Sequence, residues 1–163
     1  MARRLVTNLV LVLAVIGAAW LFWPDDRPMP EVTFNLIDGR TLHSSELRGR
    51  SLLINFWSVS CEVCLRDMPR LSRLQESLPE KDFLVIGVAL PQDPPPAVIS
   101  TAARLDPGYP IALDVHGEVA RAFGGIQVTP TSFLIAPDGR INFSERGPLD
   151  ETRVRATLLT FQG

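Results

Sequence analysis

Two largely apolar runs of strand length constrain the fold of this chain more than any other feature, SLLINFW at residues 51–57 and FLVIGVAL at residues 83–90. Continuous runs of this kind are typical of strands that are buried on both faces of a parallel sheet. Between them, apolar residues recur at the spacings of one helix face, at Leu65, Met68, Leu71, Leu74 and Leu78. The three segments together predict a β-α-β unit.

Turn signals on either side of this unit extend it into one α/β domain. Asp38-Gly39 interrupts an alternating segment, VTFNLIDGRTLH, and predicts an N-terminal β-hairpin. Asp138-Gly139 separates residues 131–136 from residues 140–144 and predicts a second hairpin. Helices are predicted over PQDPPPAVISTAARL, GEVARAF and LDETRVRATLLTF. In the first of these helices, one face is expected to carry Val98, Ile99, Ala102 and Leu105.

The composition excludes several classes of protein. The chain has 163 residues, of which 46% are hydrophobic and 21% charged, and its net charge is −2. These values are typical of one folded domain and argue against a disordered chain. They also give no sign of a nucleic-acid partner, which a strongly basic balance would indicate.

The N-terminal segment predicts a membrane anchor over residues 1–24. Arg3 and Arg4 precede an uncharged run at residues 5–23, which would reach about 28 Å as a helix and could span a bilayer. A cleaved signal peptide is the alternative, because Gly17-Ala18-Ala19 offers small residues to a peptidase.

The positive-inside rule places both arginines in the cytoplasm and the rest of the chain outside. In a bacterium the protein would thus cross the inner membrane once, with its C-terminal domain in the periplasm, although a eukaryotic secretory origin stays open. The proline-rich residues 25–30 are predicted to be a linker, and residues 31–163 a single domain.

Cys61 and Cys64 are the only cysteines, and they form a Cys-X-X-Cys motif. Cys61 follows a predicted buried strand where the next helix begins, so backbone N–H groups and the positive end of the helix dipole favour its thiolate. In such motifs the pKa of the first cysteine commonly falls to about 3.5–7.5. Cys64 lies one turn further in, so Cys61 is expected to attack a disulfide and Cys64 to resolve it.

The pair has two other interpretations. A structural disulfide with this spacing closes almost no loop and would remove little entropy from the unfolded state. A copper-binding or chaperone module could use both sulfurs as ligands, but His43 and His116 are each alone in sequence and complete no metal site. Both histidines are expected at the surface, and redox chemistry is favoured.

LLINFWSVSCEVCLRDMP followed by VTPTSFLIAPDGRI resembles the thioredoxin superfamily. Within it, the chain is similar to the membrane-anchored TlpA-like and ResA-like thiol-disulfide oxidoreductases, which include cytochrome c maturation proteins. The resemblance covers roughly residues 30–162. Its motifs are Trp57 four residues before Cys61, the cysteine pair, Pro69 and Thr129-Pro130.

The resemblance implies a thioredoxin-like fold with a central mixed sheet flanked by helices, and no cofactor or metal. It implies that Pro130 is cis and lies against the cysteine pair, where the residues alone would suggest a strand-edge proline. It also implies protein thiol and disulfide substrates and a membrane thiol-electron transporter as reductant. The substrate groove would comprise Trp57, Glu62, Val63 and Thr129.

Four positions depart from the family pattern: Asn55, Ser60, Glu62-Val63 and Gln92. Gln92 is aligned with a buried glutamate of the ResA-like branch, so the proton acceptor for Cys64 is in question. Asp93 is the nearest carboxylate after the same strand and is a possible acceptor. The favoured interpretation of Asp93 is instead that it is a solvated turn residue, which caps the following helix.

Overall fold

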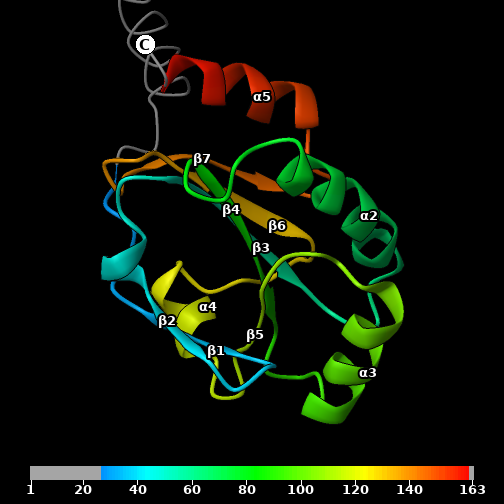
Figure 1. The fold of residues 1–163 in the computed structure, drawn as a ribbon. Coiled ribbons are helices and arrows are strands. Elements are labelled where there is room, and N and C mark those ends of the chain that lie inside the picture. The colour runs from blue at the N-terminus through cyan, green and yellow to red at the C-terminus, as the bar shows by residue number, and fades with distance from the viewer. Residues whose placement is uncertain (1–26, 162–163) are drawn as a thin grey trace, which may run out of the picture.

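A seven-stranded sheet forms the centre of the computed structural model, which describes residues 27–161 (Figure 1). The strands are β1 (Thr33–Leu36), β2 (Thr41–His43), β3 (Ser51–Trp57), β4 (Phe83–Ala89), β5 (Ile111–Leu113), β6 (Thr131–Ile135) and β7 (Ile141–Arg146). The helices are η1 (Ser44–Leu47), α2 (Glu62–Glu76), α3 (Pro95–Leu105), α4 (Glu118–Ala122) and α5 (Glu151–Thr160). The strand order is β2-β1-β5-β4-β3-β6-β7.

The predicted β-α-β unit is confirmed. β3 and β4 are parallel neighbours, with Asn55 opposite Gly87, and α2 connects them. Every residue of both strands is buried, which explains why neither run alternates in polarity. β6 pairs with β3 in the antiparallel direction, so the sheet is mixed, as the resemblance implied.

Both predicted hairpins are also present, but the sequence prediction missed β5 and η1. β1 pairs with β2, and β6 with β7, in each case antiparallel. β5 is only three residues long and lies between β4 and β1. A strand of this length is too short to show a period, so only its neighbours reveal it.

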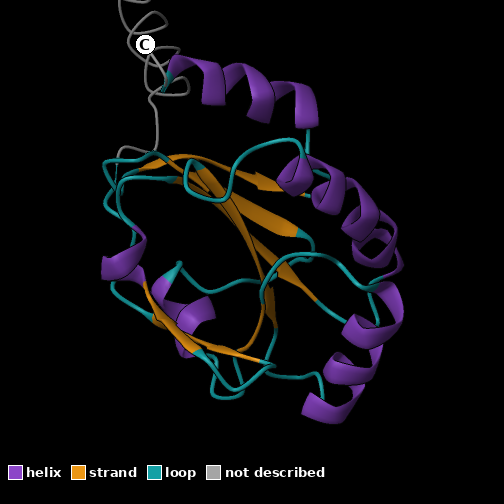
Figure 2. Ribbon diagram, in the orientation of Figure 1, coloured by secondary structure: helices purple, strands orange, loops and turns teal. Residues whose placement is uncertain are grey.

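The sheet has a separate hydrophobic core on each face. Figure 2 shows helices on both sides of the sheet. One core contains residues of α2, α3 and α5. The other contains residues of η1, α4 and the β1–β2 hairpin. Ile99 is 44% exposed and lies in neither core, so the face predicted for α3 is wrong at this residue.

The start of the folded part differs from the prediction. The Met29 N–H donates to the Gly139 carbonyl at 2.9 Å, and the Ile141 N–H donates to the Arg27 carbonyl at 2.7 Å. The Met29 side chain belongs to a core. Part of the predicted linker therefore packs on the β6–β7 turn, because the apolar Met29 side chain is buried in the core.

The predicted anchor over residues 1–24 lies outside the described residues. Within residues 27–161, no helix is both long enough and apolar enough to cross a membrane.

Candidate active site

The cysteine pair lies where β3 passes into α2. Cys61 and Cys64 form a disulfide, with their Cα atoms 5.2 Å apart. Cys61 is half-buried, whereas Cys64 is 2% exposed. The accessible sulfur is thus the first one, as the attacking role predicted for Cys61 requires, and the division of roles between the two cysteines stays a prediction.

Backbone groups at the start of α2 surround the Cys61 sulfur. Cys61 is the N-cap residue, and the Cys64 N–H donates to its Sγ at 3.2 Å. This N–H is one of the donors that the helix itself leaves unpaired. Such a donor, together with the helix dipole, stabilises a thiolate at Cys61 once the disulfide is reduced.

A second backbone segment approaches the same sulfur from the loop before β6. The Thr129-Pro130 bond is cis, as the resemblance implied. The Thr129 carbonyl oxygen lies 3.6 Å from Cys61 Sγ. Thr129 is half-buried, Pro130 is buried and Val128 is 53% exposed. The loop therefore places a backbone carbonyl beside the reactive sulfur and exposes an apolar side chain one residue earlier.

Asp93 holds the loop that leads from β3 to Cys61. Its carboxylate accepts hydrogen bonds from Ser58 Oγ at 2.8 Å and from the Val59 N–H at 2.9 Å. Asp93 is 8% exposed, and the N-cap of α3 is Pro94, with no side-chain cap. The interpretation of Asp93 as a solvated capping residue is therefore wrong. Its role as a proton acceptor stays a prediction, although both of its oxygens already bind the loop.

The buried carboxylate nearest to Cys64 in sequence is Asp67, which the sequence prediction missed. Asp67 is 9% exposed and accepts a hydrogen bond from Arg70 Nη1 at 3.1 Å. It lies three residues after Cys64 on α2, and residues with this spacing are neighbours on a helix surface. This spacing was the available signal. Gln92, which corresponds to a buried glutamate of the ResA-like branch, is exposed.

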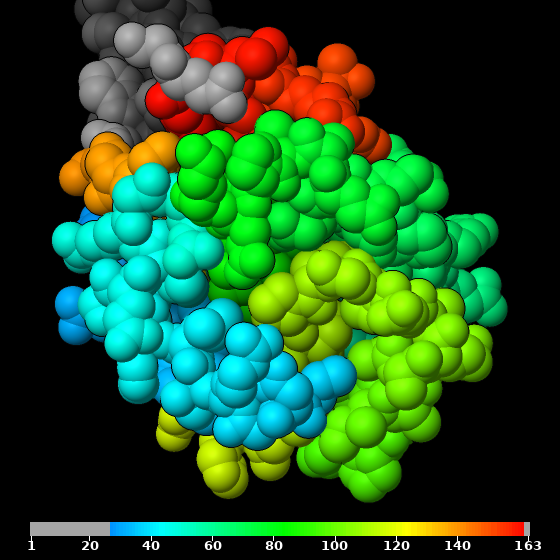
Figure 3. Space-filling view, viewed as in Figure 1, coloured from blue at the N-terminus to red at the C-terminus, as the bar shows by residue number. Residues whose placement is uncertain are grey.

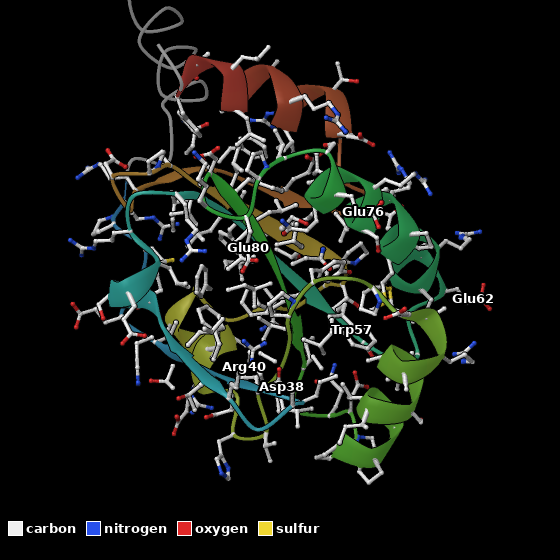
Figure 4. The ribbon with its side chains drawn as sticks, in the orientation of Figure 1. Asp38, Arg40, Trp57, Glu62, Glu76 and Glu80 are labelled. Carbon is white, nitrogen blue, oxygen red and sulfur yellow. A yellow bond between two sulfur atoms is a disulfide. The ribbon has the colours of Figure 1, made fainter. Side chains whose placement is uncertain are left out.

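The predicted groove residues lie at very different depths. Trp57 is 0% exposed, so its assignment to a substrate-contacting surface is wrong: the last residue of a strand buried on both faces has no path to solvent. Glu62 is exposed and Val63 half-buried. Figure 4 shows Glu62 at the outer edge of the molecule and Trp57 in its interior.

Trp57 and Tyr109 carry the two buried side-chain polar atoms that have no hydrogen-bond partner within residues 27–161, Nε1 and the hydroxyl oxygen. Both residues border Gly87, where an added Cβ would lie 3.4 Å from Trp57 Nε1 and 3.2 Å from the Tyr109 ring. Burial, aided by the charge of Asp67, raises the pKa of Tyr109 well above its ordinary value of 10. On the same sheet, Asn55 Nδ2 donates to Ser132 Oγ at 3.0 Å.

The described part of the chain adds no ligand that would support the copper-binding alternative. His43 and His116 are both exposed, as expected. Among residues 27–161, no group of three or more His, Cys, Asp or Glu side chains is placed to hold a metal ion.

A mixed sheet with a cysteine pair at a helix N-terminus, faced by a cis-proline loop, defines the thioredoxin-like class of thiol-disulfide oxidoreductases. Comparisons with known proteins agree. The chain matches the model of the Redoxin family over residues 24–158. It is 31% identical over 150 residues to the thiol-disulfide oxidoreductase ResA of Bacillus cereus, with 85% of this chain and 86% of that relative covered.

Solved structures give the same result. A putative thioredoxin from Neisseria meningitidis is similar with a TM-score of 0.75 and 30% identity, over 84% of this chain and 91% of that one. A putative thiol:disulfide interchange protein DsbE from Chlorobium tepidum shares the fold, with a TM-score of 0.76 and 22% identity over 85% and 98% of the two chains. The chain therefore belongs to the Redoxin family and is a ResA-like thiol-disulfide oxidoreductase of the thioredoxin superfamily.

Proposed function

We propose that this oxidoreductase reduces disulfides of exported proteins in the periplasm, held to the inner membrane by residues 5–23. The observation that carries the exchange chemistry is the asymmetry of the pair, with a half-buried Cys61 at the N-terminus of α2 and a buried Cys64 behind it. The reducing direction rests on the resemblance to the ResA-like branch. Arg3 and Arg4, ahead of the uncharged run, support the orientation.

The reaction transfers two electrons by disulfide exchange. The Cys61 thiolate attacks one sulfur of the substrate disulfide and forms a mixed disulfide, while the other substrate sulfur leaves as a thiolate and takes up a proton. Cys64 then loses its proton and attacks Cys61 Sγ, which releases the second substrate sulfur. The products are a substrate dithiol and the Cys61–Cys64 disulfide, which a membrane thiol-electron transporter would reduce again.

The loop containing Pro130 would align the substrate for this exchange. Thr129 offers a backbone carbonyl beside Cys61, Val128 exposes an apolar side chain one residue earlier, and Glu62 and Val63 would border the other side. An extended polypeptide around a cysteine fits such a surface. Apocytochrome c cysteines and misoxidised periplasmic proteins are the substrates that we propose.

We assign the proton of Cys64 to Asp67 in preference to Asp93. Asp67 is buried, lies one helical turn from Cys64 and accepts from Arg70 through Oδ1, whereas both Asp93 oxygens bind the loop before Cys61. A carboxylate next to a buried thiol can take its proton directly or through one water.

A redox titration of the full-length protein tests the direction of the reaction. A reductant is expected to have a midpoint potential at or below about −200 mV, whereas a value near −120 mV, typical of strong oxidants, would overturn the proposal. A parallel titration with copper tests the alternative, since tight copper binding to the reduced pair would favour a metal-handling module. Protease access to the C-terminal domain from the periplasmic side tests the location.

A further inference from the structure

A groove of about 760 Å³ lies between the C-terminal ends of α2 and α3 and the β1–β2 turn. We call it the α2–α3 groove. In Figure 3 the β1–β2 hairpin (blue) and the segment after α3 (yellow-green) border a hollow on the face toward the viewer. α2 has 15 residues, so the groove lies about 22 Å along the helix from the cysteine pair. It is separate from the site described above.

The floor of the groove is apolar. Leu84, Ala102 and Ile111 are each at most 3% exposed, and the Tyr109 ring lines the same surface. Ile99, exposed to 44%, forms part of the wall. An exposed isoleucine above a buried apolar floor is a surface on which an aliphatic side chain can be desolvated.

The charged side chains that line the groove are Asp38, Arg40, Glu76, Glu80 and Asp106. Arg40 is paired with Asp38 at 2.8 Å, and this pair lowers the pKa of Asp38 and raises that of Arg40. The charge of Glu80 also raises the pKa of Arg40, so Arg40 offsets part of the negative charge of Glu80, whereas Glu76 and Asp106 make no side-chain ion pair within residues 27–161. Arg50 lies close by, but its Nη1 donates to the Glu80 backbone carbonyl at 3.2 Å. In Figure 4, Asp38 and Arg40 lie on one side and Glu76 and Glu80 on the other.

The backbone adds to this negative potential. α2 and α3 both end at the groove, so the negative ends of two helix dipoles face it. Arg73 and Arg104 lie in the last turns of these helices but do not line the groove. A cation with an apolar stem complements such a surface, because its stem can cover the floor while its charge meets the rim.

We propose that the α2–α3 groove is a docking site for a basic, partly apolar segment of a partner polypeptide. A Lys or Arg side chain of the partner would lie among Glu76, Glu80 and Asp106, and an aliphatic neighbour would cover the half-buried Ile37 and the exposed Ile99. The groove lies too far from Cys61 for one side chain to serve both sites. It is therefore a second contact with a partner, independent of disulfide exchange.

Fluorescence anisotropy with the full-length protein tests the charge requirement. The probe is a short labelled peptide of alternating lysine and leucine, and its counterpart with glutamate for lysine should not bind. Glu76→Gln/Glu80→Gln should weaken binding about fivefold or more, and added salt should act in the same direction. The matched control is Glu31→Gln/Glu118→Gln, which removes two exposed carboxylates outside the groove and should leave affinity unchanged.

A steric variant tests the location. Ala103 is exposed and lines the groove, so Ala103→Phe should abolish peptide binding without lowering the thermal midpoint. Ser100→Phe places the same ring on an exposed part of α3 outside the groove and should bind normally. Cys61→Ser should also bind normally, which separates this proposal from the redox function.

Several outcomes would overturn the proposal. Equal binding by the wild type and both groove variants would show that the peptide does not bind in the groove. Loss of binding in Cys61→Ser would show that it binds at the cysteine pair instead. Free lysine that competes as well as the peptide would indicate a small-cation site. Self-association that Ala103→Phe disrupts would make a second copy of this chain the occupant.

Discussion

The two ends of α2 have opposite chemistry. At the N-terminal end, a backbone N–H donates to the Cys61 sulfur, and the dipole favours an anion. At the C-terminal end, Glu76 and the following Glu80 add negative charge where the dipole is already negative. One helix can therefore stabilise a thiolate at one end and attract a cation at the other, so redox chemistry and docking need not share a surface.

The largest effect is expected at the N-terminal end. Cys61→Ser should abolish reduction of a disulfide substrate, because the accessible nucleophile is lost. Cys64→Ser should retain attack and accumulate a mixed disulfide, visible on a non-reducing gel. Accumulation in Cys61→Ser instead would reverse the roles of the two cysteines.

The Asp67→Asn variant tests whether a carboxylate in the N-terminal half of α2 accepts the proton of Cys64. Asp67→Asn should slow breakdown of the mixed disulfide by about tenfold or more, since general-base assistance is typically worth about 10²- to 10⁴-fold. Attack by Cys61 should keep its rate, and rapid-quench measurements separate the two steps. Unchanged resolution would exclude Asp67 as the acceptor.

Asp93 tests how the loop positions Cys61. Asp93→Asn cannot accept both hydrogen bonds as the carboxylate does, so the free energy of unfolding should fall by about 1–3 kcal/mol in urea denaturation. Asp82→Asn, a change at an exposed residue, is the control and should have little effect. If Asp93→Asn were as stable as this control but resolved mixed disulfides slowly, Asp93 would be the proton acceptor after all.

Tyr109 lines the groove and, like Trp57, borders Gly87. Tyr109→Phe should stabilise the protein by about 1 kcal/mol, because it removes a buried hydroxyl without a partner in the described residues. Destabilisation would show that the hydroxyl has a partner.

The same residue predicts a pH dependence. The pKa of Tyr109 is raised in the folded state, so above about pH 10 the unfolded chain loses this proton while the folded chain keeps it. Wild-type stability should therefore fall as pH rises through this range, and Tyr109→Phe should lack this contribution. Tyrosinate absorbance reports Tyr109 directly, because it is the only tyrosine of the chain.

Most of the core and the redox pair could be predicted from local patterns. The runs of β3 and β4 and the apolar face of α2 are each visible within a few residues, and only two residues separate Cys61 from Cys64. Trp57 shows the limit of such reasoning. Its place in a motif near Cys61 suggested contact with substrate, whereas its strand is buried on both faces and carries it inside.

The β-α-β unit, the hairpins and the sulfur chemistry follow from the sequence, because periodicity, turn residues and helix polarity are properties of short stretches. The strand β5, the buried position of Asp93 and the groove between α2 and α3 depend on the folded chain. Each depends on contacts between distant segments: Ser58 and Asp93 are 35 residues apart, and β5 exists only between β4 and β1. A side chain's neighbours across such separations are set by how the whole chain packs, and no local pattern records them.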